Sequence, residues 1–325
     1  MSKKSGFWIF LGTLLVILGL LGFTVLMGSI DWDFSKLGTS NYETNTHGID
    51  EDFTSIVIDV ETANVAFLPS EDGECKVVCH EAPDYKHLIF VDNGTLHISS
   101  PKGIKFNFNW LNFDRQIITV YLPKSEYSSL SIDTDTGGVN LPKDFSFGSI
   151  DISLDTGDAK VFASATEHIN IETDTGSILI ENASAGSVNL DTQTGRITVS
   201  ALICGGDLRV DVDTGKANIK NTNCHSFFSD GDTGDIHLES LVADEKINIE
   251  RDTGDVTFLE IDAPEIYIDT DTGDIEGSLL SGKMFSADTN TGSIRVPSDS
   301  VGGICKLTTD TGDIKVTISE QIVLP

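Results

Sequence analysis

Residues 266–275 read IYIDTDTGDI, and close variants of this stretch recur from residue 130 almost to the end of the chain. Its Thr-Gly dipeptide occurs ten times, at successive spacings of 19 or 20 residues. The ten glycines are Gly137, Gly157, Gly176, Gly195, Gly215, Gly234, Gly254, Gly273, Gly292 and Gly312. A repeat this regular indicates a solenoid, in which each copy forms one turn of a stack and buries its apolar side against its neighbours.

Apolar and polar residues alternate on both sides of each Thr-Gly pair. In the quoted copy Ile266 and Ile268 precede the glycine, and Ile275 follows it. The same positions are apolar in most copies, and a period of two is typical of strands. Because glycine tolerates a positive φ, it suits a tight corner between two strands. The sequence therefore predicts an all-β fold, a parallel β-helix or β-solenoid of about ten coils of 19–20 residues.

The beginning of the chain differs in composition. Phe7 to Met27 is almost wholly apolar, and its 21 residues would span about 31 Å as a helix, which matches the hydrocarbon core of a bilayer. Lys3 and Lys4 precede it and Asp31 follows it, so the positive-inside rule places the N-terminus in the cytoplasm. We expect an uncleaved transmembrane anchor. The alternative is a cleaved signal peptide, whose apolar region is usually shorter and ends at a small-residue site.

These patterns divide the chain into five parts. We expect a short cytoplasmic N-terminus at residues 1–6, a transmembrane helix at 7–30 and a polar tether at 31–52. Residues 53–129 show irregular strand-like alternation and are predicted to cap one end of the rod. Residues 130–325 form the predicted solenoid. This order predicts a single-pass protein of the cell membrane with its β domain outside the cell.

The composition is strongly acidic. The 325 residues include 51 Asp and Glu against 21 Lys and Arg, a formal net charge of −30. This argues against nucleic acid as a partner, because phosphate binding needs clustered basic residues. Residues 130–319 hold 34 acidic and 12 basic residues, a net of −22. One acidic column stands two positions before the corner glycine and comprises Asp135, Asp155, Asp174, Asp213, Asp232, Asp252, Asp271 and Asp310.

Two explanations of this column remain open. Asp beside a Thr-Gly corner can accept hydrogen bonds from backbone N–H groups two residues further on, so the column can be turn chemistry alone. Alternatively, the stacked carboxylates form a ladder of weak sites for Ca²⁺, or for another divalent cation, that bridge adjacent coils. No other cofactor is predicted.

Catalysis is not predicted. Asp-Thr-Gly occurs eight times and is also the active-site tripeptide of aspartic proteases, but that chemistry needs two facing aspartates that share a proton. Glycan-cleaving β-helices place paired carboxylates in a cleft, and long loops wall that cleft. The repeats here vary by one residue in length, which leaves no room for such loops. A glycan-active envelope enzyme remains the alternative to a non-enzymatic protein.

Among the five cysteines, Cys204 and Cys224 each lie nine residues after a corner glycine and should be neighbours on adjacent coils. A coil spacing near about 4.8 Å falls within the Cα range of disulfides, although parallel stacked side chains often point poorly for bonding. These two residues are therefore a candidate disulfide.

The apolar N-terminal segment, the stretch TVYLPKSEYSSLSI at residues 119–132 and the serial DTGDI coils resemble a bacterial family of envelope proteins known as the putative-adhesin family, a domain of unknown function. The resemblance covers residues 53–318 and implies a β-helical domain. It also implies a link to Lia-type cell-envelope stress systems, to which some members belong and which respond to cationic antimicrobial peptides. The family has no established catalytic residues, so none is implied here.

These features together predict a membrane-anchored, non-enzymatic β-helix outside the cell, which acts as an adhesin-like or scaffold module and takes part in envelope stress. Its expected partners are the membrane, through the N-terminal helix, and a surface glycan, a protein or a cationic peptide. An acidic rod that captures cations or cationic peptides is the electrostatic version of this prediction.

Overall fold

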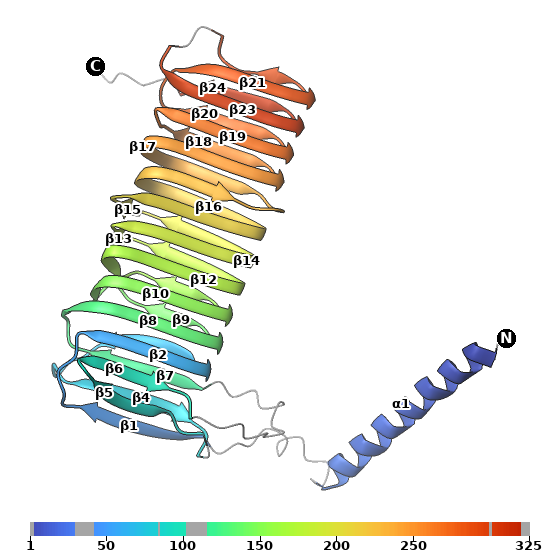
Figure 1. Ribbon diagram of the computed structural model, residues 1–325, viewed down its shortest axis with the longest axis vertical. Coiled ribbons are helices and arrows are strands. Elements are labelled where there is room, and N and C mark those ends of the chain that lie inside the picture. Colours follow the sequence, from blue (N-terminus) through green and yellow to red (C-terminus); the bar gives the residue numbers. More distant parts are fainter. Residues whose placement is uncertain (1–2, 30–41, 84, 102–115, 299–300, 320–325) are drawn as a thin grey trace.

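The computed structural model describes residues 3–29, 42–83, 85–101, 116–298 and 301–319 (Figure 1). It contains a helix, α1 (Lys3–Ser29), whose side chains are described at residues 12–25 and 27–28. Over the residues described, no helix combines the length and the apolar character that a membrane span requires. Residues 3–6 of the predicted N-terminus belong to α1, and residues 43–49 of the predicted tether form a strand, while residues 1–2 and 31–41 lie outside the described residues.

The rest of the described chain is built from strands. The strands before and inside the cap are β1 (Glu43–Ile49), β2 (Ser55–Thr62), β3 (Asn64–Pro69), β4 (Cys75–Glu81), β5 (Leu88–Asp92), β6 (Thr95–Ser99) and β7 (Ile117–Leu122). Those of the repeats are β8 (Glu126–Thr136), β9 (Val139–Leu141), β10 (Ser146–Thr156), β11 (Ala159–Val161), β12 (Ser164–Glu181), β13 (Ser184–Ala185), β14 (Ser187–Ser200), β15 (Ile203–Cys204), β16 (Asp207–Asp230), β17 (Ile236–Thr253), β18 (Val256–Ile261), β19 (Glu265–Thr272), β20 (Ile275–Leu279), β21 (Lys283–Thr291), β22 (Ile294–Arg295), β23 (Gly303–Thr311) and β24 (Ile314–Ile318).

The repeats stack into a rod, and the predicted all-β solenoid is confirmed, with about nine turns (Figure 1). Strands that precede the corner pair in parallel from coil to coil, so that Leu130, Ile150 and Ile169 lie in register. Strands that follow the corner do the same, as Ala159 does with Val139 and Ile178. The inward residues of both strands are buried and form one continuous apolar core.

The corner glycines are required by close backbone contact as well as by conformation. Gly234 has a φ of +145°, and a Cβ at this position would overlap the carbonyl oxygen of Gly215 in the neighbouring coil. The first threonine of the DTDTG stretch points inward and satisfies such a carbonyl. For example, the Thr309 hydroxyl donates a hydrogen bond of 3.0 Å to the carbonyl of Gly273. The motif therefore encodes a close-packed corner in which most of the inward threonine hydroxyls pair with a carbonyl of a neighbouring coil.

The stack begins earlier than the predicted boundary at residue 130. β2 pairs in parallel with β8, and Asp59, Val60 and Thr62 take the register of the repeat. Ala63 stands where other coils have the corner glycine, and its carbonyl faces Gly137. The segment at 53–129 therefore contains a full coil as well as cap strands.

Chain order and stacking order differ at both ends of the rod. At the N-terminal end β2 lies between β6 and β8. At the C-terminal end β23 lies between β19 and β21, so the last coil in sequence is inserted beneath the penultimate one (Figure 1). Consequently the penultimate coil, residues 283–296, forms the far end of the stack.

The N-terminal end is closed by antiparallel strands. β7 pairs with β3 of the first coil, β4 pairs with β7, and β1 pairs with β4, so a ribbon of three strands continues from the stack. β5 pairs antiparallel with β6. The inward residues of β4, among them Val77 and Cys79, are fully buried.

The predicted Cys204–Cys224 disulfide is wrong. Both cysteines are buried and free, as are the other three cysteines. The Cys204 thiol contacts the carbonyl oxygens of Gly206 and Asp207, each at 3.4 Å, and not the Cys224 sulfur. Burial raises the pKa of the Cys224 thiol to about 12, which further disfavours the thiolate needed for oxidation.

Candidate functional site

The carboxylates of the rod form three parallel columns, defined by their distance from the corner glycine. The corner column is the predicted one, two positions before the glycine. The ladder column lies one position after the glycine and comprises Asp158, Asp235, Asp255, Asp274 and Asp313. The strand column lies four positions before the glycine and comprises Asp133, Glu172, Asp191, Asp211, Asp230, Glu250, Asp269 and Asp288.

The ladder column is structural. The carboxylate of Asp158 accepts a hydrogen bond of 2.9 Å from the backbone N–H of Ser177, and Asp255 accepts one of 2.9 Å from Asp274. Hydrogen bonds from the backbone N–H and the hydroxyl of Ser293 lower the pKa of Asp313. These hydrogen bonds run between coils and involve the Asp after the glycine. Among the described residues, no backbone N–H donates to a carboxylate of the corner column, so the turn chemistry expected there is not observed.

The corner column is compensated in places by neutral amides. The Gln193 amide donates to Asp174 at 2.8 Å, and the Asn290 amide donates to Asp310 at 3.0 Å. Elsewhere the column is crowded: burial and the carboxylate of Asp155 raise the pKa of Asp135. This column therefore retains uncompensated charge between the coils that carry amides.

The strand column is uncompensated near the N-terminal end of the rod, whereas further along Asp211 accepts the backbone N–H of Asp230 and Glu250 accepts the amide of Asn248. Asp191 has neither a hydrogen bond nor an ion pair among the described residues, and its pKa is raised by burial and by the carboxylates of Asp211 and Glu172. Beside it Ser131, Ser153 and Asn170 are small, and they leave a shallow hollow of about 240 Å³. Asp133, Asp151 and Glu172 also line this hollow. An open, carboxylate-lined depression of this kind can accept a cationic group.

The columns do not gather three ligands around one point. Among the described residues, no three carboxylates bring oxygen atoms within 4.8 Å of one another. Calcium takes 6–8 oxygens, so the predicted ladder of Asp135, Asp155, Asp174, Asp213, Asp232, Asp252, Asp271 and Asp310 offers at most pairs of protein carboxylates per ion. The Ca²⁺ ladder stays a prediction.

A second hollow runs along the corner glycines near the N-terminal end. It has a volume of about 580 Å³ and is lined by the backbone of Gly137, Gly157 and Gly176 and by polar side chains. Those side chains are Thr62, Asn64, Gln116, Thr136, Asn140, Thr156, Asp158, Lys160 and Thr175. Asp158 is the one acidic residue among them, and the set resembles the hydroxyl- and amide-rich lining that binds neutral polar chains.

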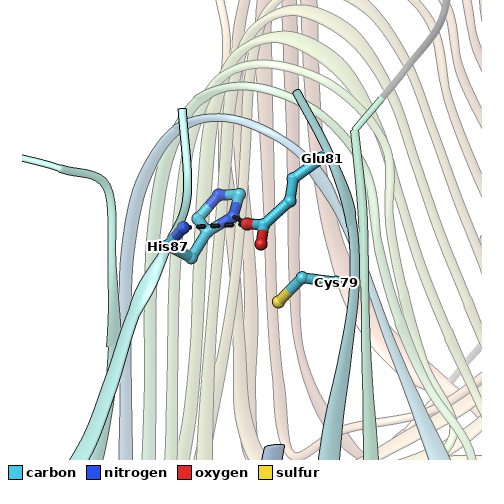
Figure 2. Close-up of side chains that lie close together, drawn as sticks. All are labelled: Cys79, Glu81 and His87. Carbon is cyan, nitrogen blue, oxygen red and sulfur yellow. Dashed lines mark hydrogen bonds and ion pairs between the residues drawn. The ribbon is translucent and has the colours of Figure 1, made fainter. Parts of the chain in front are cut away.

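A cluster that the sequence patterns did not predict lies inside the N-terminal cap. Cys79 and Glu81 come from β4, and His87 follows the short segment after it (Figure 2). Burial, with the Glu81 carboxylate nearby, raises the pKa of the Cys79 thiol to about 12. The alternation Val77, Cys79, Glu81 places an acidic residue on the core side of a strand. This pattern is the one feature of the sequence that could have indicated the cluster.

The model of the Toastrack DUF4097 family matches residues 53–239 and 205–324. No curated protein matches the chain. Among solved structures it is similar to a putative adhesin from Bacteroides fragilis, with 15% identity over 86% of this chain and 98% of that one and a TM-score of 0.45. It is also similar to two proteins from Parabacteroides distasonis. One is a putative adhesin, with 13% identity over 73% of this chain and 99% of that one and a TM-score of 0.44. The other is a putative lipid binding protein, with 17% identity over 73% of this chain and 98% of that one and a TM-score of 0.32.

Proposed function

The chain belongs to the Toastrack DUF4097 family, and on that premise we propose that it is a non-enzymatic binding module of the cell envelope whose strand column captures cationic ligands. The single observation that carries the proposal is the N-terminal part of the strand column beside its hollow. Asp133, Glu172 and Asp191 have no hydrogen bond or ion pair there among the described residues, and Ser153 lies between the first two.

Electrostatics explains why a cation is the favoured ligand. Carboxylates spaced about 4.8 Å apart repel one another by just under about 1 kcal/mol per pair in water. A polycation laid along the column relieves this repulsion at each coil it crosses, whereas a neutral ligand does not. The ladder column should attract a polycation less strongly, because its carboxylate oxygens already accept hydrogen bonds from backbone N–H groups. A cationic peptide, including one that attacks the envelope, fits this pattern.

Membrane attachment through the segment at residues 7–30 is part of the proposal. Its support is the apolar composition of that segment and the lysines before it. The rod would then stand outside the cell, where cationic peptides arrive. A truncation that begins at residue 42 should be released into the medium or the soluble fraction, while the full chain should stay with the membrane fraction.

The proposal is tested by measuring the binding of a lysine decapeptide to the full chain in detergent. We expect binding that weakens with salt. The triple variant Asp133→Asn, Glu172→Gln, Asp191→Asn should bind on the order of tenfold more weakly, equivalent to about 1.4 kcal/mol. The matched control Asp158→Asn, Asp255→Asn, Asp274→Asn removes the same charge from the ladder column and should lose much less. Equal losses in the two variants, or no binding at low salt, would refute the proposal.

The second hollow, which runs along Gly137, Gly157 and Gly176, favours a second candidate function, the binding of a surface glycan. Its lining is rich in hydroxyl and amide groups, and Asp158 is its one described acid, whereas glycosidic cleavage needs two facing carboxylates. Binding without cleavage is therefore the better match. Calorimetry with solubilised cell-wall glycan should show a loss of binding in Asn140→Ala, Lys160→Ala and no loss in the strand-column variant.

A further inference from the structure

Cys79, Glu81 and His87 bring three kinds of metal-binding atom together inside the N-terminal cap (Figure 2). The thiol sulfur, a carboxylate oxygen and an imidazole nitrogen all lie within 4.8 Å of one another. The three residues are 0%, 1% and 4% exposed. In the described part of the chain, this is the one group of three or more His, Cys, Asp or Glu residues with that geometry.

The hydrogen bonds around the cluster leave ligand capacity unused. Glu81 Oε2 accepts the backbone N–H of His87 at 2.8 Å and lies 2.7 Å from His87 Nδ1. Glu81 Oε1 accepts the amide of Asn45 at 2.8 Å. Among the described residues, the buried His87 Nε2 has no partner, and the Cys79 sulfur makes no hydrogen bond. The unengaged thiol sulfur is therefore free to bind a metal ion once it is deprotonated.

We propose that Cys79, Glu81 and His87 are ligands of a divalent transition-metal ion, for which Zn²⁺ is the best match. A mixed set of sulfur, nitrogen and oxygen suits this borderline-soft ion better than Ca²⁺ or Mg²⁺, which prefer oxygen alone. The ion would replace the proton that now lies between His87 Nδ1 and Glu81 Oε2. Binding releases the Cys79 proton, and the imidazole proton moves to Nε2.

The geometry requires small movements. Zinc bonds of about 2.0–2.3 Å in a tetrahedron separate the ligand atoms by about 3.3–3.7 Å. The Nδ1–Oε2 pair, now 2.7 Å apart, must therefore open by about 0.6 Å, and the sulfur must lie about 3.5 Å from both atoms. His47 is a candidate for a fourth ligand. It lies on β1 beside β4, on the same face as Cys79, and its buried Nε2 has no partner among the described residues.

The site would hold together three segments that close the rod: β4, the chain before β5 and, through His47, β1. A metal ion bound there contributes folding free energy directly to the cap. This inference does not depend on the proposed function, because the site is buried and distant in sequence from the strand column.

The test uses the full chain, freed of metal by a chelator and titrated with Co²⁺, which reports thiolate ligation through a charge-transfer band in the near ultraviolet. We expect one equivalent to bind, with a band that is lost in Cys79→Ser and kept in Cys75→Ser. Cys75 is the matched control, since it is free, buried and on the same face of β4. A band that survives Cys79→Ser, or the absence of any band in the unmodified protein, would overturn the proposal.

A second measurement needs no variant and covers the case in which Cys79→Ser does not fold. X-ray absorption of the zinc-loaded, unmodified protein should show one sulfur at about 2.3 Å and nitrogen or oxygen ligands at about 2.0–2.1 Å. A shell of nitrogen and oxygen alone would place the ion elsewhere, for example on the acidic columns, and would overturn the proposal.

Discussion

The backbone N–H of Asp313 donates a hydrogen bond of 2.7 Å to the carboxylate of Asp274, although the two residues are 39 positions apart. In the interior of the stack, the same bond links residues 19 or 20 positions apart, as in Asp274 to Asp255. The doubled separation arises because the coil between them, with Asn290 and Ser293, has moved to the end of the rod. At the end coil these two positions are neutral, Asn290 and Ser293, whereas the two coils beneath it carry Asp at both.

The first prediction concerns this bond. Asp274→Ala removes the acceptor of the Asp313 N–H and should lower the free energy of unfolding by about 0.5–1.5 kcal/mol. Asp274→Asn keeps a side-chain oxygen and removes one charge, so it should be close to neutral. Denaturant unfolding of both variants checks this. If the Asn variant is as unstable as the Ala variant, the loss of stability comes from the removed charge and not from the removed hydrogen bond, which contradicts the prediction.

The second prediction concerns the corners. Gly234→Ala adds a Cβ that overlaps the Gly215 carbonyl at a positive φ, and should cost about 2–5 kcal/mol from strain and overpacking together. Gly73→Ala is the control: its φ is +79°, but no atom lies within 4 Å of the added Cβ. It should cost about 1 kcal/mol, from conformation alone. Similar melting temperatures for the two variants would show that close stacking is not what requires glycine.

The third prediction concerns Arg251, which occupies the inward position that most other coils give to threonine. Its guanidinium donates to the Asp230 carbonyl at 2.7 Å and to the Ser229 hydroxyl at 2.6 Å. Gly231 leaves room for it. Arg251→Met should cost about 1.5–3 kcal/mol, because buried acceptors lose a charged donor. The exposed Arg196→Met should change stability by less than about 0.5 kcal/mol. Comparable losses of stability in the two variants would contradict the stabilising role of the Arg251 hydrogen bonds.

The fourth prediction concerns pH. The fold raises the pKa of Asp191, so the folded chain binds this proton more tightly than the unfolded chain does. The resulting stabilisation is present in acid, below the ordinary Asp pKa, and is lost as the pH rises through the raised value. At pH 7 Asp191→Asn should therefore stabilise the rod, by on the order of 1 kcal/mol.

The measurement for this fourth prediction is the melting temperature of both proteins between pH 3 and pH 7. The two curves should converge in acid and separate as the pH rises. An advantage for Asp191→Asn that is the same at every pH would exclude the carboxylate repulsion as its cause.

The regular part of the fold could be predicted because its determinants repeat. Gly273 and its nine equivalents fix the corners, and Ile266 or its equivalents fix the inward face. The coil at 55–69 was missed because Ala63 replaces the glycine and Val60 replaces the inward threonine. Five coils also have a second turn with a positive φ, six residues after the corner glycine. The sequence did not reveal this turn, for a similar reason. It keeps a positive φ at residues that differ in kind, namely Asn182, Ala201, Asn221, Ser240 and Glu260.

Stacking order and the cap cluster depend on contacts that no local pattern encodes. β19, β21 and β23 carry near-identical alternation, so nothing in their sequences says which two are adjacent. His87 reaches Glu81 only because the segment between them folds back inside the cap. The acidic columns, by contrast, could be predicted from the sequence. The sequence did not show which column accepts hydrogen bonds from backbone N–H groups.

The central claim is that the strand column, and not the ladder column, receives a cationic ligand. The most direct measurement is carboxyl labelling of the full chain with and without the lysine decapeptide, read by mass spectrometry at each residue. We predict that the peptide protects Asp133, Glu172 and Asp191, while labelling of Asp274 and Asp313 stays unchanged. Protection spread evenly over both columns, or confined to the ladder column, would contradict the account.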